Sequence, residues 1–511
     1  MEKKVRVRFA PSPTGGLHLG GVRTVLYNYL FAKQHKGDFI LRIEDTDQNR
    51  FVAGAEEYIY ETLKWCGLEP DESPLRGGPF APYRQSERKK IYKEYAERLV
   101  QAGHAYYAFD RPEELETMRT SRRSVANPSP QYDHRTRMYM RNSLTVTPEE
   151  TKKLLDDNTP YVIRIQMPDN ETLHLNDLIR GDVEFNTSLV DDKVLLKADG
   201  MPTYHLAVVV DDYLMGITHA FRGEEWLPSA PVHVLLWRYL FGEEKMPAWA
   251  HFPLILKPDG NGKLSKRDST RLGIPIFAMD WNDPATGEII SGFKEKGFLP
   301  EAFVNMLAVL GWNDGTEQEL YSLTELIEKF SIERVHNAGA KFNYEKAKWF
   351  NQEWIRKVSI DLLLPEVKRI YLEKGINTPD DVLLKSVIGL VRERCHLLPE
   401  FYDQGKFFFS APLQLDLETV KPKWTMAKRI FFDSFMELFD TLNEWNALSL
   451  ETAFKELAVA QKTKSGELQL PFRIMLVGEK SGPPVFEIAE LLGKNETIER
   501  INNFLAATGN W

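Results

Sequence analysis

The first 45 residues change their hydrophobic period from two to 3.6 across a single turn, and this change constrains the fold more than any other feature. Residues 5–9 alternate apolar side chains with arginine, as the residues of a half-buried strand do. A turn rich in proline and glycine follows at 11–16, and apolar residues then recur at helical spacing over 22–30. A second strand is predicted at 39–43. A strand, a helix and a strand in this order predict an α/β fold with a parallel sheet of Rossmann type.

Residues 108–200 interrupt this alternation, after two further helices predicted at 55–66 and 86–102. They contain a stretch rich in proline, serine and arginine at 118–142, together with short strand-like runs such as 161–166. We therefore interpret residues 108–200 as an insertion in the α/β domain.

Apolar runs typical of buried strands return at 206–210 and 253–256, and a loop rich in glycine and lysine follows the second run. After about residue 340 the strand signals fade. Helical periods then dominate, over 347–374, 381–398 and 426–460. The C-terminal third is therefore predicted to be all-α.

Charge and cysteine content exclude several classes of protein. The chain has 65 lysines and arginines against 74 aspartates and glutamates, a net charge of −9 over 511 residues. A uniformly acidic surface disfavours nucleic acid, yet the stretch 118–142 has a local charge of +5 from its six arginines and one aspartate. Cys66 and Cys395 lie too far apart in sequence for a disulfide framework or a cysteine-based zinc site. With no long apolar run and no leader peptide recognised, we expect a cytoplasmic protein with no membrane partner.

The turn between the first strand and the first helix has the composition of a phosphate-binding loop. It reads Pro-Ser-Pro-Thr-Gly-Gly-Leu-His-Leu-Gly-Gly over 11–21. Glycines let the backbone approach a ligand closely, and a helix start offers free N–H groups and a positive dipole end to phosphate. His18 stands at that helix start, where an imidazole can donate to a phosphate oxygen. A tight turn with an incidental histidine explains the same residues, and the loop alone does not decide between the two.

A second motif, Lys-Leu-Ser-Lys-Arg at 263–267, follows the loop after the strand predicted at 253–256. Ammonium groups on a mobile loop can follow the charge that builds on a transferring phosphoryl group. Taken alone, such a run of charge is more often a solvated loop.

Together the two motifs resemble the paired ATP signatures of class I aminoacyl-tRNA synthetases, usually written HIGH and KMSKS. They stand here as His-Leu-Gly-Gly at 18–21 and as 263–267, in the expected order and with an insertion between them. Gly21 occupies the fourth position of the first signature, so the second imidazole is absent.

Six further segments narrow the resemblance to the glutamyl-tRNA synthetases. They are Arg-Phe-Ala-Pro-Ser-Pro-Thr-Gly at 8–15, Arg-Ile-Glu-Asp-Thr-Asp at 42–47, Tyr-Arg-Gln-Ser at 83–86, Leu-Lys-Ala-Asp-Gly at 196–200, Tyr-His-Leu-Ala at 204–207 and Arg-Gly-Glu-Glu-Trp at 222–226. The match covers most of residues 1–345. The helical C-terminal third separates the chain from glutaminyl enzymes, whose anticodon domain is a β-barrel.

The resemblance implies a domain plan and a reaction. The plan is a Rossmann catalytic domain in two halves (1–107 and 201–256), an inserted domain for the tRNA acceptor end (108–200), a stem-contact region with the second motif (257–340) and an all-α anticodon-binding domain (341–511). The reaction is activation of L-glutamate with ATP to glutamyl-adenylate, with release of pyrophosphate. Transfer of glutamate to the 3′-terminal adenosine of tRNA(Glu) follows, with release of AMP, in protein synthesis. Activation is expected to need tRNA, and the protein is expected to be a monomer.

Site residues are implied one by one. The catalytic residues are His18, Lys263 and Lys266. The ATP-binding residues are Thr14, Gly15, His18, Gly20, Gly21, Lys263, Ser265, Lys266 and Arg267. The glutamate-binding residues are Arg8, Ala10, Ser12, Glu44, Tyr204 and Arg222. The tRNA-binding residues are Arg122, Arg123, Arg135, Arg137, Arg392 and Arg394.

The chemistry of the substrate fits the glutamate group. A guanidinium can hold the side-chain carboxylate with two parallel hydrogen bonds. Arg8 leaves the first strand and Arg222 follows the strand predicted at 206–210, which places both where ligands of open α/β folds bind. Glu44 is implied on the α-amino group. Without the resemblance each arginine is interpreted as a surface ion-pair partner. Val208 stands where the family has asparagine, which removes an amide contact to the substrate.

Arginines with nearby aromatic residues suit tRNA. Tyr132 and Tyr139 lie among the arginines of 118–142, a mixture fit for phosphate contact and base stacking, although a disordered basic loop is the alternative. Arg392 and Arg394, on the helix predicted at 381–398, otherwise belong to a solvated face.

Metal expectations differ for magnesium and zinc. Mg²⁺ is expected with ATP, held largely by phosphates and water. Some members of the family carry a cysteine-based zinc near 105–110. Ala108 and Asp110 stand at the expected cysteine positions here, so no zinc and no metal bound by the protein are predicted.

Three alternatives stay open. The first is an enzyme that also charges glutamine tRNA, against which Arg394 argues if it contacts the last anticodon base. The second is a short-chain relative that glutamylates a modified nucleoside, but such relatives lack the helical third. The third is a tRNA-binding paralogue without activity, which is expected to have lost His18 or the two lysines of the second motif.

Overall fold

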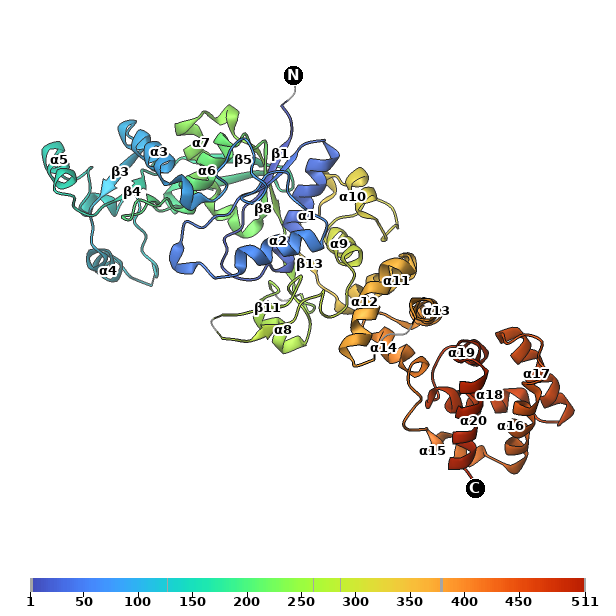
Figure 1. The fold of residues 1–511 in the computed structure, drawn as a ribbon. Coiled ribbons are helices and arrows are strands. Elements are labelled where there is room, and N and C mark those ends of the chain that lie inside the picture. Colours follow the sequence, from blue (N-terminus) through green and yellow to red (C-terminus); the bar gives the residue numbers. More distant parts are fainter. Residues whose placement is uncertain (1–2, 126, 261, 285, 377–379, 510–511) are drawn as a thin grey trace. The chain divides into compact units, whose positions relative to one another are not determined.

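The protein is described by a computed structural model over residues 3–125, 127–260, 262–284, 286–376 and 380–509. It divides into two compact units, one formed by residues up to 295 and 303–344, the other by 296–302 and 345–511. Figure 1 labels their helices and strands. Among the described residues, no helix is both long enough and apolar enough to cross a membrane.

The core of the first unit is a sheet with the strand order β2–β1–β8–β9–β5–β6. The strands are β1 Arg6–Phe9, β2 Asp38–Leu41, β8 His219–Gly223, β9 Ala248–Phe252, β5 Thr172–Asp177 and β6 Gly181–Asn186. β1 is parallel to β2 and β8, β9 is parallel to β8 and β5, and β6 closes the edge antiparallel to β5. This confirms the predicted α/β class with a parallel sheet. The hairpin β5–β6 comes from the segment interpreted as an insertion and extends the main sheet.

The helices predicted at 22–30, 55–66 and 86–102 are present as α1 Leu19–Gln34, α2 Ala55–Trp65 and α3 Lys89–Gln101. Helix α1 packs on β1, β2 and β8. Val22, Val25 and Leu26 are completely buried, as their helical spacing predicts.

The strand predicted at 206–210 is wrong, because these residues form the middle of helix α6 Tyr204–Leu214. A short run of consecutive apolar residues has no period that separates a buried strand from a buried helix. Every residue of the run is buried, since α6 packs against α3 and α7 Ala230–Leu240. Arg222 therefore lies within β8 and follows no strand at 206–210.

A small antiparallel sheet, β3–β4–β7, lies within the predicted insertion and at its start. Its strands are β3 Ala105–Ala108, β4 Val162–Ile165 and β7 Val194–Leu196, and helices α4 Pro112–Ser121 and α5 Pro148–Asp156 lie between β3 and β4 in the chain. Its buried Asp192 accepts hydrogen bonds from Tyr106 Oη at 2.7 Å and Arg137 Nη1 at 3.2 Å.

Short elements follow β9. They are β10 Ile255–Leu256, α8 Lys266–Leu272, β11 Trp281–Asn282, β12 Ile289–Ile290, α9 Pro300–Val309, α10 Leu323–Lys329 and β13 Ala340–Lys341. The strand predicted at 253–256 is thus limited to β10, which is parallel to β13. Pro253, which has no N–H to donate, separates β10 from β9.

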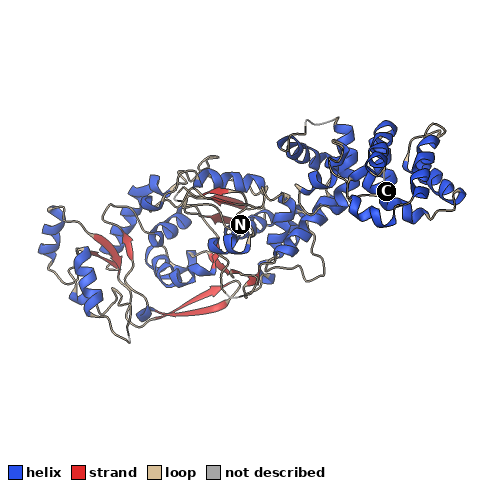
Figure 2. Cartoon of the chain, turned by 90° about the horizontal axis from the view of Figure 1, so that it is seen from below, coloured by secondary structure: helices blue, strands red, loops and turns tan. Residues whose placement is uncertain are grey.

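The second unit is built from helices, as predicted and as Figure 2 shows in blue. They are α11 Tyr344–Lys357, α12 Ile360–Glu373, α13 Asp381–Val391, α14 Glu400–Gly405, α15 Leu417–Val420, α16 Met426–Leu438, α17 Ala447–Ala460, α18 Ser465–Val477, α19 Val485–Leu492 and α20 Lys494–Ala507. Phenylalanine rings fill its core, with Phe454 edge-to-face against Phe431 at 4.9 Å and Phe435 at 5.1 Å. The helix predicted at 381–398 is shorter, because α13 ends at Val391.

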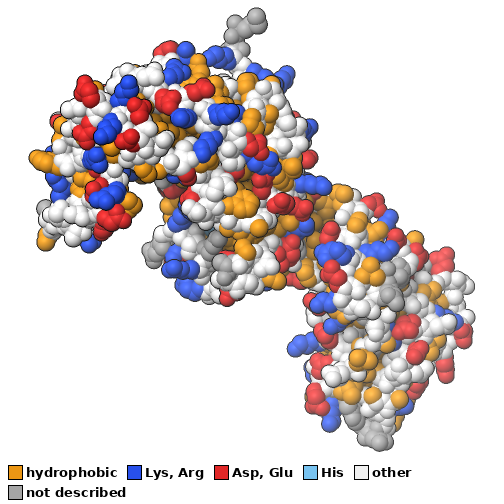
Figure 3. All heavy atoms as spheres, turned by 60° about the vertical axis from the view of Figure 1, so that its left-hand side comes forward, with side chains coloured by type: hydrophobic (Ala, Val, Ile, Leu, Met, Phe, Trp, Pro, Cys, Tyr) orange, Lys and Arg blue, Asp and Glu red, His pale blue; other side chains and the backbone are white. Residues whose placement is uncertain are grey.

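Charged side chains of both signs are mixed on the face drawn in Figure 3. Although the chain has a net charge of −9, its acidic side chains do not form one continuous acidic patch on this face. Such mixing leaves room for local basic sites on an acidic protein.

Candidate active site

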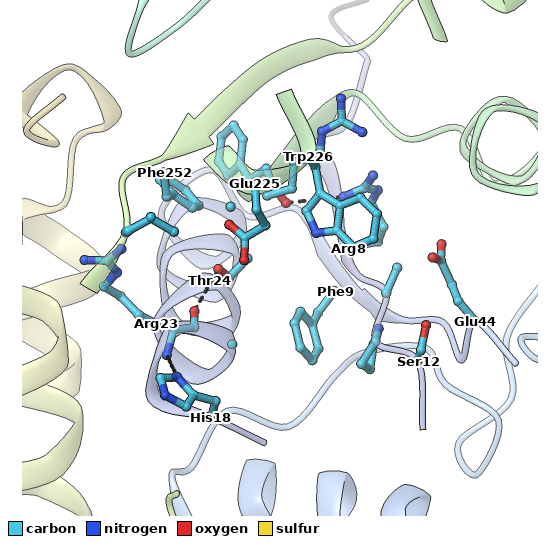
Figure 4. A pocket seen from close by; sticks show the side chains of 18 of the residues that line it. Arg8, Phe9, Ser12, His18, Arg23, Thr24, Glu44, Glu225, Trp226 and Phe252 are labelled. Carbon is cyan, nitrogen blue, oxygen red and sulfur yellow. Dashed lines mark hydrogen bonds between the residues drawn. The ribbon is translucent and has the colours of Figure 1, made fainter. Parts of the chain in front are cut away.

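A cavity of about 390 Å³ lies at the carboxyl ends of β1 and β8, beside the start of α1 (Figure 4). Ligands of open α/β folds bind at this edge of the sheet. The predicted residues that line the cavity are Arg8, Ala10, Ser12, Thr14, His18, Gly20, Gly21, Glu44, Tyr204, Arg222 and Lys263. The structure therefore brings the predicted glutamate-binding group to the same cavity as most of the predicted ATP-binding group. Gly15, Ser265 and Arg267 are outside this lining.

His18 is the N-cap of helix α1. Its Nδ1 accepts a hydrogen bond from the Gly20 N–H at 3.2 Å. In the neutral imidazole the hydrogen therefore belongs to Nε2, which makes Nε2 a donor. The cap orients the ring at the positive end of the helix dipole, so both features favour an anion at this point of the cavity.

The glycine after Gly20 reflects close packing. A Cβ atom on Gly21 would lie only 2.7 Å from Leu17 Cδ1, so a side chain there requires the buried Leu17 to move. A Cβ atom on Gly20 would meet His18 Nδ1 at 3.8 Å, an ordinary contact. A side chain at position 21 would therefore meet Leu17 first.

A tight hairpin brings Lys263 to the cavity. The Leu264 N–H donates to the Ile255 carbonyl at 2.9 Å, so the chain returns alongside β10. The exposed Lys263 ammonium pairs with Glu225 at 2.9 Å, an arrangement that contributes little energy and can be exchanged for a ligand anion.

The rest of the second motif begins helix α8. Ser265 is its N-cap and forms a capping box with Asp268, its hydroxyl donating at 2.6 Å. Arg267 is exposed. The side chain of Lys266, a predicted catalytic group, lies outside the described part of the structure.

A buried network of ion pairs supports the cavity. Arg8 Nε donates to both carboxylate oxygens of Asp212, at 3.0 and 3.2 Å. Arg42, completely buried, pairs with Asp212 at 2.8 Å and with Glu44 at 3.2 Å. Burial opposes the charge on Arg42, but the carboxylates around it outweigh burial and raise its pKa. Removing one partner from such a network typically costs about 3–5 kcal/mol.

Glu44 titrates in an unusual range. Burial raises the pKa of Glu44 to about 7, against the opposing pull of Arg42 and Arg8. In Figure 4, Glu44 and Ser12 lie on one side of the cavity, away from His18. A buried carboxylate in this position suits a cationic group of a ligand, because a bound ammonium stabilises its charged form.

Arg222 is held by acceptors from three elements. Its Nε donates to His251 Nε2 at 2.8 Å, and its Nη1 donates to Tyr204 Oη at 3.0 Å and His233 Nδ1 at 3.1 Å. The guanidinium also lies over the Trp249 ring, 4.6 Å from its centroid. Nη2 is buried and has no hydrogen-bond acceptor among the described residues. Arg222 lines the cavity, so its side chain adds positive charge to this part of the wall.

Sequence reasoning misses the residues that support the two arginines. Asp212 follows the apolar run of α6, and an acid at the end of such a run is a signal for a buried ion pair. His251 and Asp177 give no local signal, because they meet only through the pairing of β9 with β5. Val208 lines the cavity from α6 with an apolar side chain.

The arginines of the predicted insertion differ in exposure. Arg123 and Arg135 are exposed, and Arg122 lies over the ring of Tyr139, which is 76% exposed. Arg137 is turned inward, with an 11% exposed side chain paired to Asp192 at 3.2 Å.

Tyr132, interpreted above as a stacking residue, is 5% exposed and belongs to the core of this region. Its hydroxyl donates to Asp110 Oδ2 at 2.8 Å, and the other oxygen of that carboxylate accepts from the Arg141 N–H at 2.8 Å. The stacking role is therefore wrong for Tyr132. Asp110 stands where the resemblance leads us to expect a zinc-binding cysteine, and its carboxylate already accepts these two hydrogen bonds within the protein.

Two predicted anticodon residues lie just beyond α13. Arg392–Arg394 form a short 3-10 turn. Arg394 is exposed, and it donates to Gln404 Oε1 at 3.1 Å and Ser481 Oγ at 3.0 Å. These contacts orient the guanidinium on the surface of the second unit.

Potential metal ligands cluster away from the cavity. Among the described residues, His174, Asp182 and Glu184 on the β5–β6 hairpin could hold an ion, but all three are exposed. In the cavity the carboxylates of Glu44 and Glu225 are paired with Arg42 and Lys263. Neither arrangement resembles a closed metal site.

Two family descriptions match the chain. Residues 4–349 match tRNA synthetases class I (E and Q), catalytic domain. Residues 344–505 match an anticodon binding domain.

Individual relatives match over almost the whole length. The chain is 52% identical over 506 residues to a glutamate–tRNA ligase of Phocaeicola vulgatus, covering 98% of each protein. It is 49% identical over 506 residues to one of Amoebophilus asiaticus, covering 99% of this chain and 98% of the relative. Its fold is similar to the crystal structure of a glutamate tRNA ligase from Elizabethkingia meningosepticum in complex with its amino acid. That similarity has a TM-score of 0.94 at 48% identity, over 99% of both chains.

Proposed function

The chain belongs to the glutamate–tRNA ligases of class I, and we propose that the cavity beside His18 is where it joins glutamate to tRNA. One observation carries this proposal: a side chain suited to bind a carboxylate, Arg222, and a side chain suited to bind a phosphate, His18, line the same cavity. The Arg222 guanidinium has one nitrogen, Nη2, without an acceptor among the described residues, and His18 caps the start of α1.

The reaction has two steps. The α-carboxylate of glutamate attacks the α-phosphorus of ATP, and pyrophosphate leaves. A ribose hydroxyl of the terminal adenosine of tRNA, the 2′-hydroxyl in class I enzymes, then attacks the acyl carbon, and AMP leaves. Positioning and charge stabilisation account for such catalysis without a covalent nucleophile on the protein.

The glutamate end of the cavity supplies charge of both signs. Arg222 Nη2 would donate to the side-chain carboxylate, and the Glu44 carboxylate would accept from the α-ammonium. Arg8 reinforces the positive potential while Asp212 holds it in place. Ala10, Ser12 and Tyr204 complete the wall.

The ATP end relies on the backbone and on mobile cations. Thr14, Gly15, Gly20 and Gly21 would let the triphosphate approach the start of α1, where His18 Nε2–H donates. Lys263 would leave Glu225 to follow the charge on the leaving pyrophosphate, and Lys266 and Arg267 would do the same from α8. Ser265 positions α8 by capping it.

ATP carries its own metal. The carboxylates of the cavity, Glu44 and Glu225, are already paired with Arg42 and Lys263. Mg²⁺ would therefore be held mainly by phosphates and water, and it would neutralise phosphate charge. We propose no zinc, since Asp110 offers a carboxylate already engaged by Tyr132 where a thiolate is needed.

The tRNA would meet both units. We assign 108–200 to the acceptor end, through Arg122, Arg123 and Arg135, and 341–511 to the anticodon, through Arg392 and Arg394. Arg137 would act indirectly, by fixing the fold around Asp192. Residues 1–107 and 201–256 would form the catalytic domain. The region 257–340, which carries Lys263 and Lys266, would contact the stem. The enzyme would act as a monomer in the cytoplasm on tRNA(Glu).

Exchange of labelled pyrophosphate into ATP tests the activity directly. We expect exchange with glutamate when tRNA(Glu) is present and little without it. No exchange under either condition would contradict the proposal. A Lys266→Ala variant that kept the wild-type activation rate would show that the second motif has another role.

Separate charging assays with glutamate and glutamine tRNAs test the range of tRNA substrates. We expect only tRNA(Glu) to be charged, with Arg394 contributing to the choice. Equal charging of both tRNAs would identify the broader enzyme named among the alternatives.

A further inference from the structure

The tautomer of His251 is set by a buried carboxylate behind it. His251 Nδ1 lies 2.6 Å from Asp177 Oδ2, and both side chains are completely buried. Asp177 Oδ1 also accepts from the N–H groups of Ile179 and Arg180 at 3.0 Å, which fixes the carboxylate. An ionised carboxylate can only accept, so His251 Nδ1 carries the hydrogen and Nε2 keeps its lone pair. That lone pair is the acceptor for Arg222 Nε.

His233 provides a second neutral acceptor for Arg222, and it accepts through Nδ1 where His251 accepts through Nε2. Its Nδ1 faces Arg222 Nη1, so its hydrogen belongs to Nε2, which lies 3.2 Å from His205 Nδ1. Burial lowers the pKa of His233 well below its usual value and that of His205 to about 4. Burial also lowers the pKa of His251, against the pull of Asp177. The rings around Arg222 are therefore neutral.

Neutral acceptors of fixed tautomer determine the direction of the guanidinium. A protonated ring, or the other tautomer, would place an N–H against an N–H of Arg222 and push the group from its position. With Nε and Nη1 occupied, Nη2 is the nitrogen of the Arg222 guanidinium that has no acceptor among the described residues.

We propose that Asp177, His251 and His233 are positioning residues for recognition of the substrate side chain. They aim Nη2 of Arg222 at the side-chain carboxylate, and so they support the choice of a carboxylate over a carboxamide. A carboxylate is charged and accepts at both oxygens, whereas an amide is neutral and accepts at only one, so its pair with a fixed guanidinium is weaker. This inference rests on the proposed function and adds residues that do not touch the substrate.

The two histidines allow a crossed test. A glutamine side chain can place an acceptor near the position of a histidine Nε2, and an asparagine near Nδ1. His251→Gln therefore keeps an acceptor for Arg222, while His251→Asn keeps only the link to Asp177. At His233 the order is reversed, since His233→Asn keeps the acceptor and His233→Gln loses it.

We expect the acceptor-deficient variants, His251→Asn and His233→Gln, to raise the KM for glutamate roughly tenfold or more. The KM for ATP should stay unchanged, and glutamine should compete better than it does with wild type. His251→Gln and His233→Asn should recover most of the loss. Asp177→Asn, which changes almost no volume, frees the His251 tautomer and should behave as His251→Asn does, even if a ring replacement unfolds the protein.

His219→Asn is the matched control, because His219 lies at the opposite end of strand β8 from Arg222. Wild-type charging of tRNA(Glu) is measured in the same series, so a failed function is distinguished from a failed inference. With an active wild type, equal effects of asparagine and glutamine at both positions would overturn the proposal. Parallel rises in both KM values with a fall in Tm would also overturn it, since they indicate general damage.

Discussion

The two ends of the cavity, which we propose bind glutamate and ATP, are built in different ways. At the glutamate end, Arg8 and Arg222 are buried and fixed by acceptors from several strands and helices. At the ATP end, the contacts come from the start of α1 and from Lys263, an exposed side chain on a hairpin. A fixed, desolvated cation can distinguish a carboxylate from an amide, whereas a mobile ammonium can follow charge that moves during reaction. The comparison teaches that, in the proposed function, substrate selectivity would depend on fixed side chains and catalysis on exposed ones.

Removing the fixed cation should have the largest effect. We expect Arg222→Gln to lower kcat/KM for glutamate roughly 100- to 1000-fold, because a charged donor is lost from a buried site. Aminoacylation kinetics measure the change. Arg238→Gln, at a partly buried arginine of α7 paired with Glu171 and Glu243, is the control and should stay close to wild type. A loss at Arg222 of less than tenfold would contradict the assigned contact.

His18→Asn should have the next largest effect, at the other end. An asparagine oxygen can replace Nδ1 as the cap of α1 while the Nε2–H donor is lost. The rate of activation should fall roughly 100-fold with little change in the KM for glutamate. His18→Ala loses the cap as well, and should in addition be less stable by about 1 kcal/mol. An asparagine variant with wild-type pyrophosphate exchange would remove His18 from the phosphate site.

Glutamate binding should weaken as the pH falls through about 7. Burial raises the pKa of Glu44 to about 7, so below that pH the carboxyl is neutral and cannot pair with the α-ammonium. The KM for glutamate should rise by up to about tenfold per unit below the pKa. The contribution of Glu44 to the free energy of unfolding changes in the opposite direction and increases as the pH falls. A raised pKa means that the folded state holds this proton more tightly than the unfolded chain. Steady-state kinetics against pH, compared with Glu44→Gln, check the prediction, and a profile that Glu44→Gln leaves unchanged would contradict it.

The smallest effects should come from the exposed arginines of the insertion. We expect Arg123→Ala and Arg135→Ala to raise the KM for tRNA severalfold and to reduce the salt slope of binding by about 1 each. Arg137→Ala is the internal control, since loss of its pair with the buried Asp192 should lower the Tm instead. Equal salt slopes for all three variants and wild type would place the RNA elsewhere.

Much of the fold was predictable because its signals are local. The first strand, α1 and the second strand follow from one change of period. The helical C-terminal third follows from sustained 3.6-residue spacing. Helix α6 was not predictable, since a short, completely buried apolar run has no polar face to set a period. The hairpin β5–β6 could not be assigned to the main sheet, because strand order depends on pairing between distant segments.

In the candidate site, Arg222 also combines a feature that the sequence indicates with a feature that depends on contacts between distant segments. The sequence, through its family resemblance, singled out Arg222 and His18 as candidates for binding a carboxylate and a phosphate, and the structure places both at one cavity. Only the tertiary structure decided which atoms of Arg222 are paired within the protein and which nitrogen keeps no acceptor among the described residues. Its acceptors lie on α6, α7 and β9, and the carboxylate behind them lies on β5. Hydrogen bonds between neighbouring elements, and the burial that keeps the histidines neutral, exist only once the sheet has its strand order.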